Sequence, residues 1–452
     1  MLGEKKIKKI LEKALLSSRA DETEVLIILF DSKLSRFANS VIHQNMAEYN
    51  AIFFSRAAMG KKVGASSSSG FDMEMMKKTV SRACEYARQQ KENPDFSGFP
   101  HPQPFHKISS LDEETARLSP DKMAGMVKII TDKADSAGAG ASGAFWVQFQ
   151  EMAVMNSKGI FCYFPSTSAS ITNVVTRGEY TGYSEDSARA VRNIDFEAVA
   201  DEAIEASASL NHIAEVEPGE YTIIAEEYAI AMMLEYLASM SFTATSVEEG
   251  KSFLAGNWGK QVVGDNISIW DDGFDARGFV LPFDFEGIPK KRVNFIRDGR
   301  AMGVVYDHYY ASKEGKSSTG HAVPPNPEYN EPLPMNIFMT SGDSNLEDMI
   351  KSTDRGLLIK RFHYIREVHP LKTMITGMTR DGVFLIEKGE KVARVKNLRF
   401  TQSITDALSC VEKISLGRKL VMGRENYANV PSSLVVPKLK IRSFNFTGKT
   451  TF

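Results

Sequence analysis

The chain has 452 residues, of which 42% are hydrophobic and 25% are charged, and its formal net charge is −2. This length exceeds what one compact core accommodates, so we expect two or three domains. The 55 basic and 57 acidic residues leave no basic excess, which excludes an electrostatic footprint for nucleic acid. Three scattered cysteines argue against a disulfide framework and a Cys-based zinc site, and they suit a reducing cytoplasm.

The first predicted element is an amphipathic helix at the start of the chain. In KKIKKILEKALL, the apolar residues Ile7, Ile10, Leu11, Ala14 and Leu15 have the spacing of one helix face. Lysines interrupt this run, so it lacks the continuous apolar core of a signal peptide. No other run approaches the roughly 18 apolar residues of a transmembrane helix. We therefore expect a soluble, cytoplasmic protein whose first helix packs on its own domain; binding of this helix to a membrane surface is the alternative.

Strand-forming and helix-forming segments then alternate. The run Val25–Phe30 is rich in β-formers, and a turn near Gly60 joins two further strands, which indicates a hairpin-rich sheet. Hydrophobic spacing and capping residues predict helices over 72–90, 119–137 and 195–210. Helices packed on an antiparallel sheet are typical of an α+β domain, which we assign to residues 1–215.

The second half of the chain has a different pattern. Glu217-Pro218-Gly219 has the composition of a linker, and a helix is predicted over 226–241. Beyond it, short strands alternate with Gly and Pro, with a short helix over 345–351. This pattern predicts a β-rich domain over 216–452, barrel-like or sandwich-like. The expected fold class is therefore α+β: an N-terminal antiparallel sheet with packed helices, followed by a β-rich domain.

Five stretches carry a resemblance to a known family. They are LSRFANSVIHQN (34–45), VMNSKGIFCYF (154–164), the segment 284–322 ending in STGHA, the strand pair at 377–400, and VVPKLKIRSFNFTG (435–448). In order and spacing they resemble the TldD/PmbA family of peptidase-like proteins, some of which are called modulators of DNA gyrase. The resemblance covers essentially the whole chain. It implies an N-terminal α/β domain, a β-rich C-terminal domain, and oligomerisation.

The resemblance also implies where a metal site would lie. TldD-type members carry His-Glu-x-x-x-His on a helix early in the second domain and a later Cys, a ligand set that leaves one position open for a reactive water. In this chain Leu234 and Ser239 stand at the two histidine positions, Glu235 is retained, and Arg380 stands at the cysteine position. Leucine cannot coordinate a metal, and arginine is a permanent cation that repels one. The resemblance thus implies a PmbA/TldE-type member, which pairs with a TldD-type partner.

Alternatives to that interpretation rest on other histidines. No histidine occurs between His212 and His308, so a helical His pair is excluded in any register. His363 and His369 are six residues apart, an even offset that places both on one face of an unbroken strand. With a bend, Asp381 or Glu367 would supply oxygen ligands, and a remodelled zinc site would result.

Further candidates come from two polar turns. His321, in the loop Ser-Thr-Gly-His, would orient a peptide carbonyl or act as an acid or base; the alternative is a histidine that bonds to its own loop. Arg380 would bind a peptide carboxylate or pair with Glu235. We interpret Arg380-Asp381-Gly382 as a turn between strands with a local ion pair, and Asp271-Asp272-Gly273 as a solvated turn.

We therefore expect a non-metal, substrate-admitting or accessory subunit of a cytoplasmic proteolytic assembly that acts on unfolded or flexible peptides. Its partner would be a TldD-type subunit or a second copy of itself, with no direct contact to nucleic acid or membrane. The alternatives are an active metallopeptidase with a remodelled zinc site and a non-enzymatic peptide-binding module. No cofactor is expected otherwise. The candidate residues are Glu235 and His321 for catalysis, and Thr319, Gly320, Arg380 and Asp381 for substrate binding.

Overall fold

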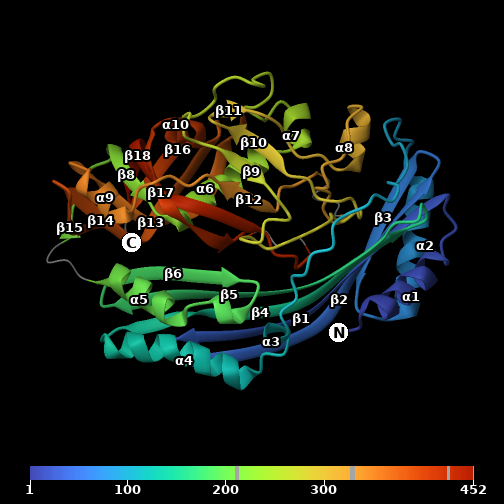
Figure 1. Cartoon of the computed structure of the whole chain (residues 1–452), viewed down its shortest axis with the longest axis horizontal. Helices are drawn as coiled ribbons and strands as arrows, with labels where there is room; N and C mark the ends of the chain where they lie inside the picture. The colour runs from blue at the N-terminus through green and yellow to red at the C-terminus, as the bar shows by residue number, and fades with distance from the viewer. Residues whose placement is uncertain (209–212, 326–330, 425–427, 451–452) are drawn as a thin grey trace.

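The computed structural model describes residues 1–208, 213–325, 331–424 and 428–450. They form two stacked layers (Figure 1): a long, curved N-terminal sheet lies on one side, and a β-rich unit built from the second half of the chain lies on the other. Helices α1 and α2 cover one end of the N-terminal sheet, and helices α4 and α5 cover the other end. The α+β fold class is confirmed.

The N-terminal sheet has six strands in the order β3-β2-β1-β4-β5-β6, and every neighbouring pair is antiparallel. Its strands are β1 (Glu22–Ala38), β2 (Val41–Met59), β3 (Lys62–Ser69), β4 (Gly140–Asn156), β5 (Phe161–Arg177) and β6 (Tyr180–Ala188). Its helices are α1 (Glu4–Leu15), α2 (Met73–Gln89), α3 (Glu113–Ala116), α4 (Pro120–Ser136) and α5 (Phe196–Ser207), with a 3₁₀ turn at Val191–Asn193. The predicted helices are therefore confirmed; residues 209–210 of the last one lie outside the described residues.

The stretch 25–30 of β1 is continuously apolar because both of its faces are buried. Val25, Ile27 and Leu29 contact the core beneath α1 and α2. Leu26 and Ile28 point to the opposite face, where they pack with side chains of the second layer. Since neighbouring side chains of a strand point to opposite faces, a continuous apolar run is what such a strand requires.

The second layer is a larger sheet of twelve strands. Its strands are β7 (Ile213–Ala214), β8 (Gly219–Ala225), β9 (Ile269–Asp271), β10 (Val293–Arg297), β11 (Arg300–Ala301), β12 (Asn336–Met339), β13 (Arg355–His369), β14 (Met374–Glu387), β15 (Glu390–Val395), β16 (Leu398–Ser403), β17 (Val411–Met422) and β18 (Ser433–Lys449). Its helices are α6 (Glu227–Ser241), α7 (Ala244–Glu248), α8 (His308–Lys313), α9 (Leu346–Lys351) and α10 (Ile404–Ser409), with a 3₁₀ turn at Pro370–Lys372.

Five strands of this sheet close into a ring. Strand β18 pairs with β8, β8 with β13, β13 with β14, β14 with β16, and β16 again with β18. The rings of Phe362, Phe400 and Phe444 pack together between these strands. The barrel-like expectation therefore fits, and most strands of this sheet are short, as expected; β13, β14, β17 and β18 are the long exceptions.

Helix α6 packs against β13 and β18 and is almost entirely buried. Its apolar side chains belong to the largest hydrophobic cluster among the described residues. Tyr228 of α6 also contacts the N-terminal sheet, because its ring packs against that of Tyr183 on β6. None of the helices in the described ranges combines the length and apolar content that a membrane crossing requires.

Candidate functional site

The predicted site residues form two separate clusters. Thr319, Gly320 and His321 lie in the loop after α8, whereas Glu235 lies on α6, and Arg380 and Asp381 lie on β14. The loop cluster is bonded to Asp271 on β9. The second cluster is bonded to Thr181 on β6, so it lies where the two layers meet.

His321 is locked inside the loop cluster. Its side chain is 0% exposed, and its Nε2 lies 2.9 Å from Oδ1 of Asp271. Its Nδ1 lies 2.9 Å from Oγ1 of Thr319. Burial and the neighbouring Lys290 lower the pKa of His321, and the Asp271 carboxylate opposes them. A histidine with both ring nitrogens bonded and no exposed surface supports the loop; the geometry offers it no contact with a substrate.

Two neighbours hold this loop in place. Gly320 has φ +74, and a Cβ there would lie 2.3 Å from the carbonyl oxygen of Pro289, so only glycine fits. Asp271 is buried, and its Oδ2 accepts hydrogen bonds from the backbone N–H groups of Met335 (2.9 Å) and Asn336 (2.7 Å). The interpretation of Asp271 as part of a solvated turn is therefore wrong: it joins three segments of the C-terminal half.

The positions that correspond to metal ligands do not fit a metal. Leu234 is 0% exposed and belongs to the apolar core around α6, while Ser239 lies on the exposed face of the helix. Glu235 accepts a hydrogen bond from the backbone N–H of Arg424 at 2.7 Å. These three positions provide no ligand set for zinc, because Leu234 offers only hydrocarbon, Ser239 a hydroxyl on another face of the helix, and Arg380 a guanidinium. Across residues 1–208, 213–325, 331–424 and 428–450, no three His, Cys, Asp or Glu side chains are grouped to hold a metal ion.

Asp381 is the best-anchored member of the second cluster. Its Oδ2 accepts a hydrogen bond from Nε of Arg361 at 2.7 Å, and its Oδ1 accepts one from the hydroxyl of Thr181 at 2.6 Å. The guanidinium of Arg361 also lies 3.9 Å from the centre of the Tyr183 ring. The expected turn at Arg380-Asp381-Gly382 is wrong: the three residues lie inside β14, where Asp381 has φ +54 and the register with β13 shifts.

Arginines dominate the space beside α6. Arg380 is half exposed, with its Nε 3.8 Å from Oδ1 of Asp381. Among the ion pairs of the described residues, none joins Arg380 to Glu235, so the expected pair is not formed. Burial lowers the pKa of His363, and the nearby Arg380, Arg361 and Arg424 lower it further. The Asp381 carboxylate opposes this effect. Of these arginines, Arg380 stands at one of the positions that would hold a metal, and a guanidinium there repels a cation.

The two histidines His363 and His369 keep the same strand face, but among the described residues they do not form a metal site. Register shifts interrupt β13 on both sides of Arg366, and Tyr364 has φ +57. Each shift adds one residue to β13, so His363 pairs with Met378 and His369 with Met374, four residues apart on β14, and the even spacing survives the two bulges. His369 is exposed at the end of β13, and His363 lies under the arginines.

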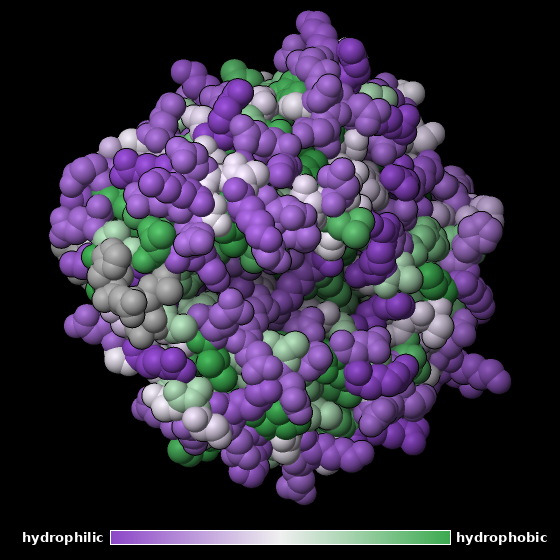
Figure 2. All heavy atoms as spheres, turned by 60° about the vertical axis from the view of Figure 1, so that its left-hand side comes forward, coloured by the Kyte–Doolittle hydropathy of each residue, from purple (hydrophilic) through white to green (hydrophobic). Residues whose placement is uncertain are grey.

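A charged network joins the two layers next to this cluster. Glu202 on α5 accepts hydrogen bonds from Lys360 on β13 (2.6 Å) and Lys419 on β17 (2.8 Å). Lys360 also donates to Glu226 at 3.0 Å, and Lys419 contacts the hydroxyl of Tyr228. A cavity of about 280 Å³ lies among these side chains. Figure 2, which brings this end of the molecule forward, shows a mostly hydrophilic hollow between the two halves.

A second cavity, of about 480 Å³, is lined in part by Asp381. Thr181 and Arg394 line it together with Asp381. Arg394 donates to the carbonyl oxygens of Ala206 (2.6 Å) and Thr181 (3.0 Å), so it also ties β15 to the N-terminal layer. Sequence reasoning missed Arg361, Arg394 and the Lys–Glu network, because no local motif marks residues that meet only across the two layers.

Comparisons with known proteins agree with this fold. The family model described as "PmbA/TldA metallopeptidase C-terminal domain" matches residues 218–448, and the model described as "PmbA/TldA metallopeptidase central domain" matches residues 103–210. The chain belongs to the PmbA/TldA metallopeptidase family. Membership in the TldD/PmbA family, expected from five short stretches of sequence, is therefore confirmed.

Curated relatives fall into partial and full-length matches. An uncharacterised protein of Methanocaldococcus jannaschii is 27% identical, over 58% of this chain and 61% of its own length. A metalloprotease TldD homologue of Buchnera aphidicola is 30% identical, over 44% of this chain and 42% of its own. The chain thus spans about half the length of these first curated relatives. Metalloprotease PmbA of Escherichia coli O157:H7 is 23% identical, over 96% of both chains.

A solved structure shows the same fold. TldE from Thermococcus kodakarensis superposes with a TM-score of 0.86 at 20% sequence identity, over 98% of this chain and 100% of that chain. At this level of identity the likeness concerns the fold, and the residues of the site are interpreted from this chain's own geometry.

Proposed function

We propose that this protein is a PmbA/TldE-type subunit without a resident metal, which admits unfolded or flexible peptides to a metal-bearing TldD-type partner in the cytoplasm. One observation carries the proposal: the three positions that would hold a metal are occupied by the buried hydrocarbon of Leu234, the exposed hydroxyl of Ser239 and the guanidinium of Arg380. A cationic site disfavours a divalent metal and favours an anionic or carbonyl-bearing ligand.

Arg380 is the residue suited to meet such a ligand. Its side chain is 48% exposed, whereas that of Arg361 is 14% exposed and tied to Asp381. A guanidinium matches a carboxylate with two parallel N–H···O bonds, so Arg380 would hold a peptide C-terminus, an acidic side chain or a carbonyl oxygen. In this role Asp381 positions the arginines and does not contact the peptide.

The full-length likeness supports the PmbA/TldE type for this chain. The match to a protein named PmbA and the superposition on a protein named TldE each span at least 96% of the chain, whereas the match to a TldD homologue spans 44%. The chain therefore has the PmbA/TldE type of likeness over both of its halves, in keeping with Leu234, Ser239 and Arg380 at the positions that would hold a metal.

The deciding experiment measures metal content and peptide cleavage. Elemental analysis of the tag-free protein should give far less than one metal per chain, and an unstructured peptide should be cleaved only when a TldD-type partner is added. Stoichiometric zinc with cleavage by the isolated chain would establish the alternative of a remodelled metallopeptidase. Peptide affinity without turnover, even with the partner present, would establish a non-enzymatic binding module.

A matched pair of arginine variants tests the site itself. Arg380→Ala should raise the KM of the two-subunit assembly for the peptide about tenfold, the effect of losing one charge-assisted contact, and leave kcat nearly unchanged. Arg355→Ala removes a 63% exposed arginine at the far end of β13 and should change neither value. Equal effects of the two variants would contradict the assignment.

A further inference from the structure

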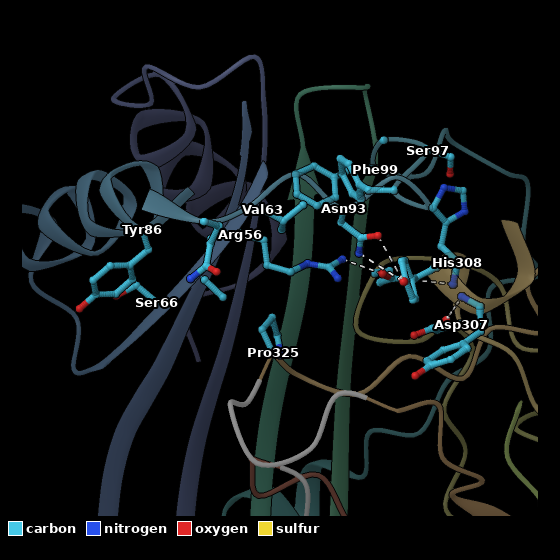
Figure 3. A pocket seen from close by; sticks show the side chains of 18 of the residues that line it. Arg56, Val63, Ser66, Tyr86, Asn93, Ser97, Phe99, Asp307, His308 and Pro325 are labelled. Carbon is cyan, nitrogen blue, oxygen red and sulfur yellow. Dashed lines mark hydrogen bonds and ion pairs between the residues drawn. The ribbon is translucent and has the colours of Figure 1, made fainter. Parts of the chain in front are cut away.

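A third cavity, of about 880 Å³, lies at the opposite end of the molecule from the α5–β6 edge. Figure 3 shows it between two walls: β3 and α2, with Ser66 and Tyr86, form one, and the start of α8, with Asp307 and His308, forms the other. Arg56 and Asn93 reach into the space between them. None of the residues predicted for catalysis or substrate binding lines this cavity.

The cavity follows the edge of a sheet. Five consecutive residues of β3, 63–67, line it. Since alternate side chains of a strand point to opposite faces, only a cavity along the strand edge is lined by an unbroken run. Strand β3 ends the order of the six-stranded sheet, and among the described residues its strand partner is β2. Its outer edge therefore offers backbone N–H and C=O groups to another strand.

Helix α2 covers one face of β3, so the side chains of an added strand have room on the other face. A Cβ on Gly64 would lie 2.3 Å from the backbone nitrogen of Ala87 on α2, so the helix covers this face closely. On the other face Ala65 is paired in register with Arg56, and Arg56 with Glu24, in a row across three strands. The cavity opens on the side of Arg56.

Carboxylates outnumber cations around Arg56. Its guanidinium lies 2.7 Å from both Glu24 and Glu286, and Asp307 and Asp284 are buried close by. Burial raises the pKa of Asp307 to about 7, with the charge of Glu286 adding to the rise. Burial and Glu286 likewise raise the pKa of Asp284 to about 8. Glu286 and Asp307 accept from backbone N–H groups, and Lys290 lies near Asp284. Around Arg56, however, the carboxylates of Glu24, Glu286 and Asp307 share one guanidinium, so an incoming cation would be attracted to them.

We propose that this cavity binds an extended peptide as an additional strand on the edge of β3, with a lysine or arginine side chain of that peptide directed at Asp307 and Glu286. This inference rests on the proposed function only for its choice of a peptide as the ligand. Addition of a strand to a free edge supplies affinity through the backbone, and a pocket for one side chain supplies selectivity.

Aromatic side chains fit the stem of such a basic residue. Tyr309 and Tyr310 contact each other edge-on at 5.1 Å on the α8 wall, and Phe99 lies 5.0 Å from the Arg56 guanidinium on the opposite side. Lysine and arginine bury their methylene groups against apolar surface while the charged end reaches polar partners. The cavity thus offers an apolar path that ends at a carboxylate.

The test uses fluorescence anisotropy with the full-length protein and labelled hexapeptides of sequence Thr-Val-Lys-Val-Thr-Val. We expect the lysine peptide to bind at least tenfold more tightly than the same peptide with norleucine in place of lysine. Asp307→Asn should remove this difference and keep the cap of α8, because the Oδ1 that accepts from Tyr310 N–H is retained. Equal binding of the two peptides, or an unchanged preference in Asp307→Asn, would overturn the proposal.

Two controls complete the design. Asp195→Asn changes the matching N-cap of α5, remote from the cavity, and should leave peptide binding unaltered. Two further peptides carry N-methyl groups at the odd or at the even backbone nitrogens. Only one of them should bind more weakly, because every second N–H of an added strand points to β3; equal weakening of both would exclude an added strand. If this chain alone binds neither peptide but the assembly with the partner still cleaves, the proposed peptide site in the cavity is refuted and the accessory role stands. If the chain binds the lysine peptide as expected but no cleavage appears with the partner, only the accessory role is refuted.

Discussion

Glu24 shows how a buried carboxylate responds to an unequal balance of charge. It is 2% exposed, it shares Arg56 with Glu286, and its Oε2 has no hydrogen-bond partner. Burial raises the pKa of Glu24 to about 7, Arg56 lowers it, and Glu286 raises it. The folded protein therefore holds this proton more tightly than the unfolded chain does, so the contribution of Glu24 to stability is full below pH 4.5 and is lost as the pH rises to about 7.

The variant Glu24→Gln tests this dependence. Because glutamine cannot ionise, the free energy of unfolding of the variant should fall less with rising pH than that of the wild type. The free energy of unfolding of the variant minus that of the wild type should therefore increase by about 2 to 3 kcal/mol between pH 5 and pH 8. Urea unfolding at the two pH values measures it. Glu48→Gln, an exposed position on β2, should show no such movement; a wild-type slope in Glu24→Gln would contradict the assignment.

Position 234 tests whether α6 retains room for a metal ligand. Leu234→His would place an imidazole among apolar side chains and remove a packed leucine, which should lower the free energy of unfolding by about 2 to 5 kcal/mol. Ser239→His, on the exposed face of the same helix, should stay within about 0.5 kcal/mol. Thermal or urea unfolding compares the two. Equal stability of both variants would mean that position 234 is accessible after all.

At the scale of the elements, the bulge of β14 holds the arginines in place through Asp381. Its carboxylate bonds to Arg361 and Thr181 at the point where the register with β13 shifts. Asp381→Asn keeps the shape and the left-handed backbone that asparagine tolerates, but leaves the largely buried guanidinium of Arg361 (14% exposed) without its counter-charge. We expect a loss of about 3 kcal/mol in the free energy of unfolding.

The matched control for this variant is Asp354→Asn, an exposed aspartate just before β13, which should have an effect of about 0.5 kcal/mol or less. Cleavage by the assembly of Asp381→Asn with a TldD-type partner should also show a raised KM, since Arg380 loses its positioning neighbour. A variant as stable as wild type would show that the Arg361–Asp381 pair contributes little.

Elements with a strong local signal could be predicted from the sequence. The N-cap Ser119 accepts from the N–H of Lys122, and Asp72 accepts from that of Met75, so both helices begin where local chemistry places them. The bulges of β13 could not be predicted, because they depend on pairing with β14 and leave no periodic trace.

Contacts between residues that are far apart in the sequence could not be predicted from local sequence patterns either. His321 was recognised as either a catalytic group or a loop histidine, and the structure bonds it to Asp271, fifty positions earlier in the sequence. That partner resembled an ordinary turn residue, because its burial depends on β12 packing beside β9. The candidate site was predicted residue by residue, but its division into two clusters follows from topology.

At the scale of the whole molecule, two different kinds of contact hold the layers together. Near β1, the apolar side chains of Leu26 and Ile28 pack with those of Phe283 and Phe285. At the α5–β6 end, ion pairs centred on Glu202 join the layers beside the ring contact of Tyr183 with Tyr228. An apolar contact is indifferent to protonation and an ionic one is not, so the two ends of the interface should respond differently to acid.

The acid response can be assigned to Glu202. Burial raises the pKa of Glu202, but the charges and hydrogen bonds of Lys360 and Lys419 together outweigh burial and bring the pKa down to about 2. Its contribution to stability is therefore full above pH 4.5 and is lost as the pH falls toward 2. Glu202→Gln should reduce the free energy of unfolding by about 1 to 3 kcal/mol at pH 7 and have almost no effect at pH 2.

Glu205 provides the comparison within the same helix. It lies three residues further along α5, pairs with Lys391 at 3.3 Å and is 77% exposed, so Glu205→Gln should change stability little at either pH. Urea unfolding at pH 7 and pH 2 measures all three proteins. A penalty in Glu202→Gln that is equal at both pH values would mean that packing, and not the ion pairs with Lys360 and Lys419, joins the layers at this end. A penalty confined to pH 7 would mean that the ionised carboxylate of Glu202, paired with Lys360 and Lys419, stabilises the contact of the layers at this end, and that acid removes this stabilisation.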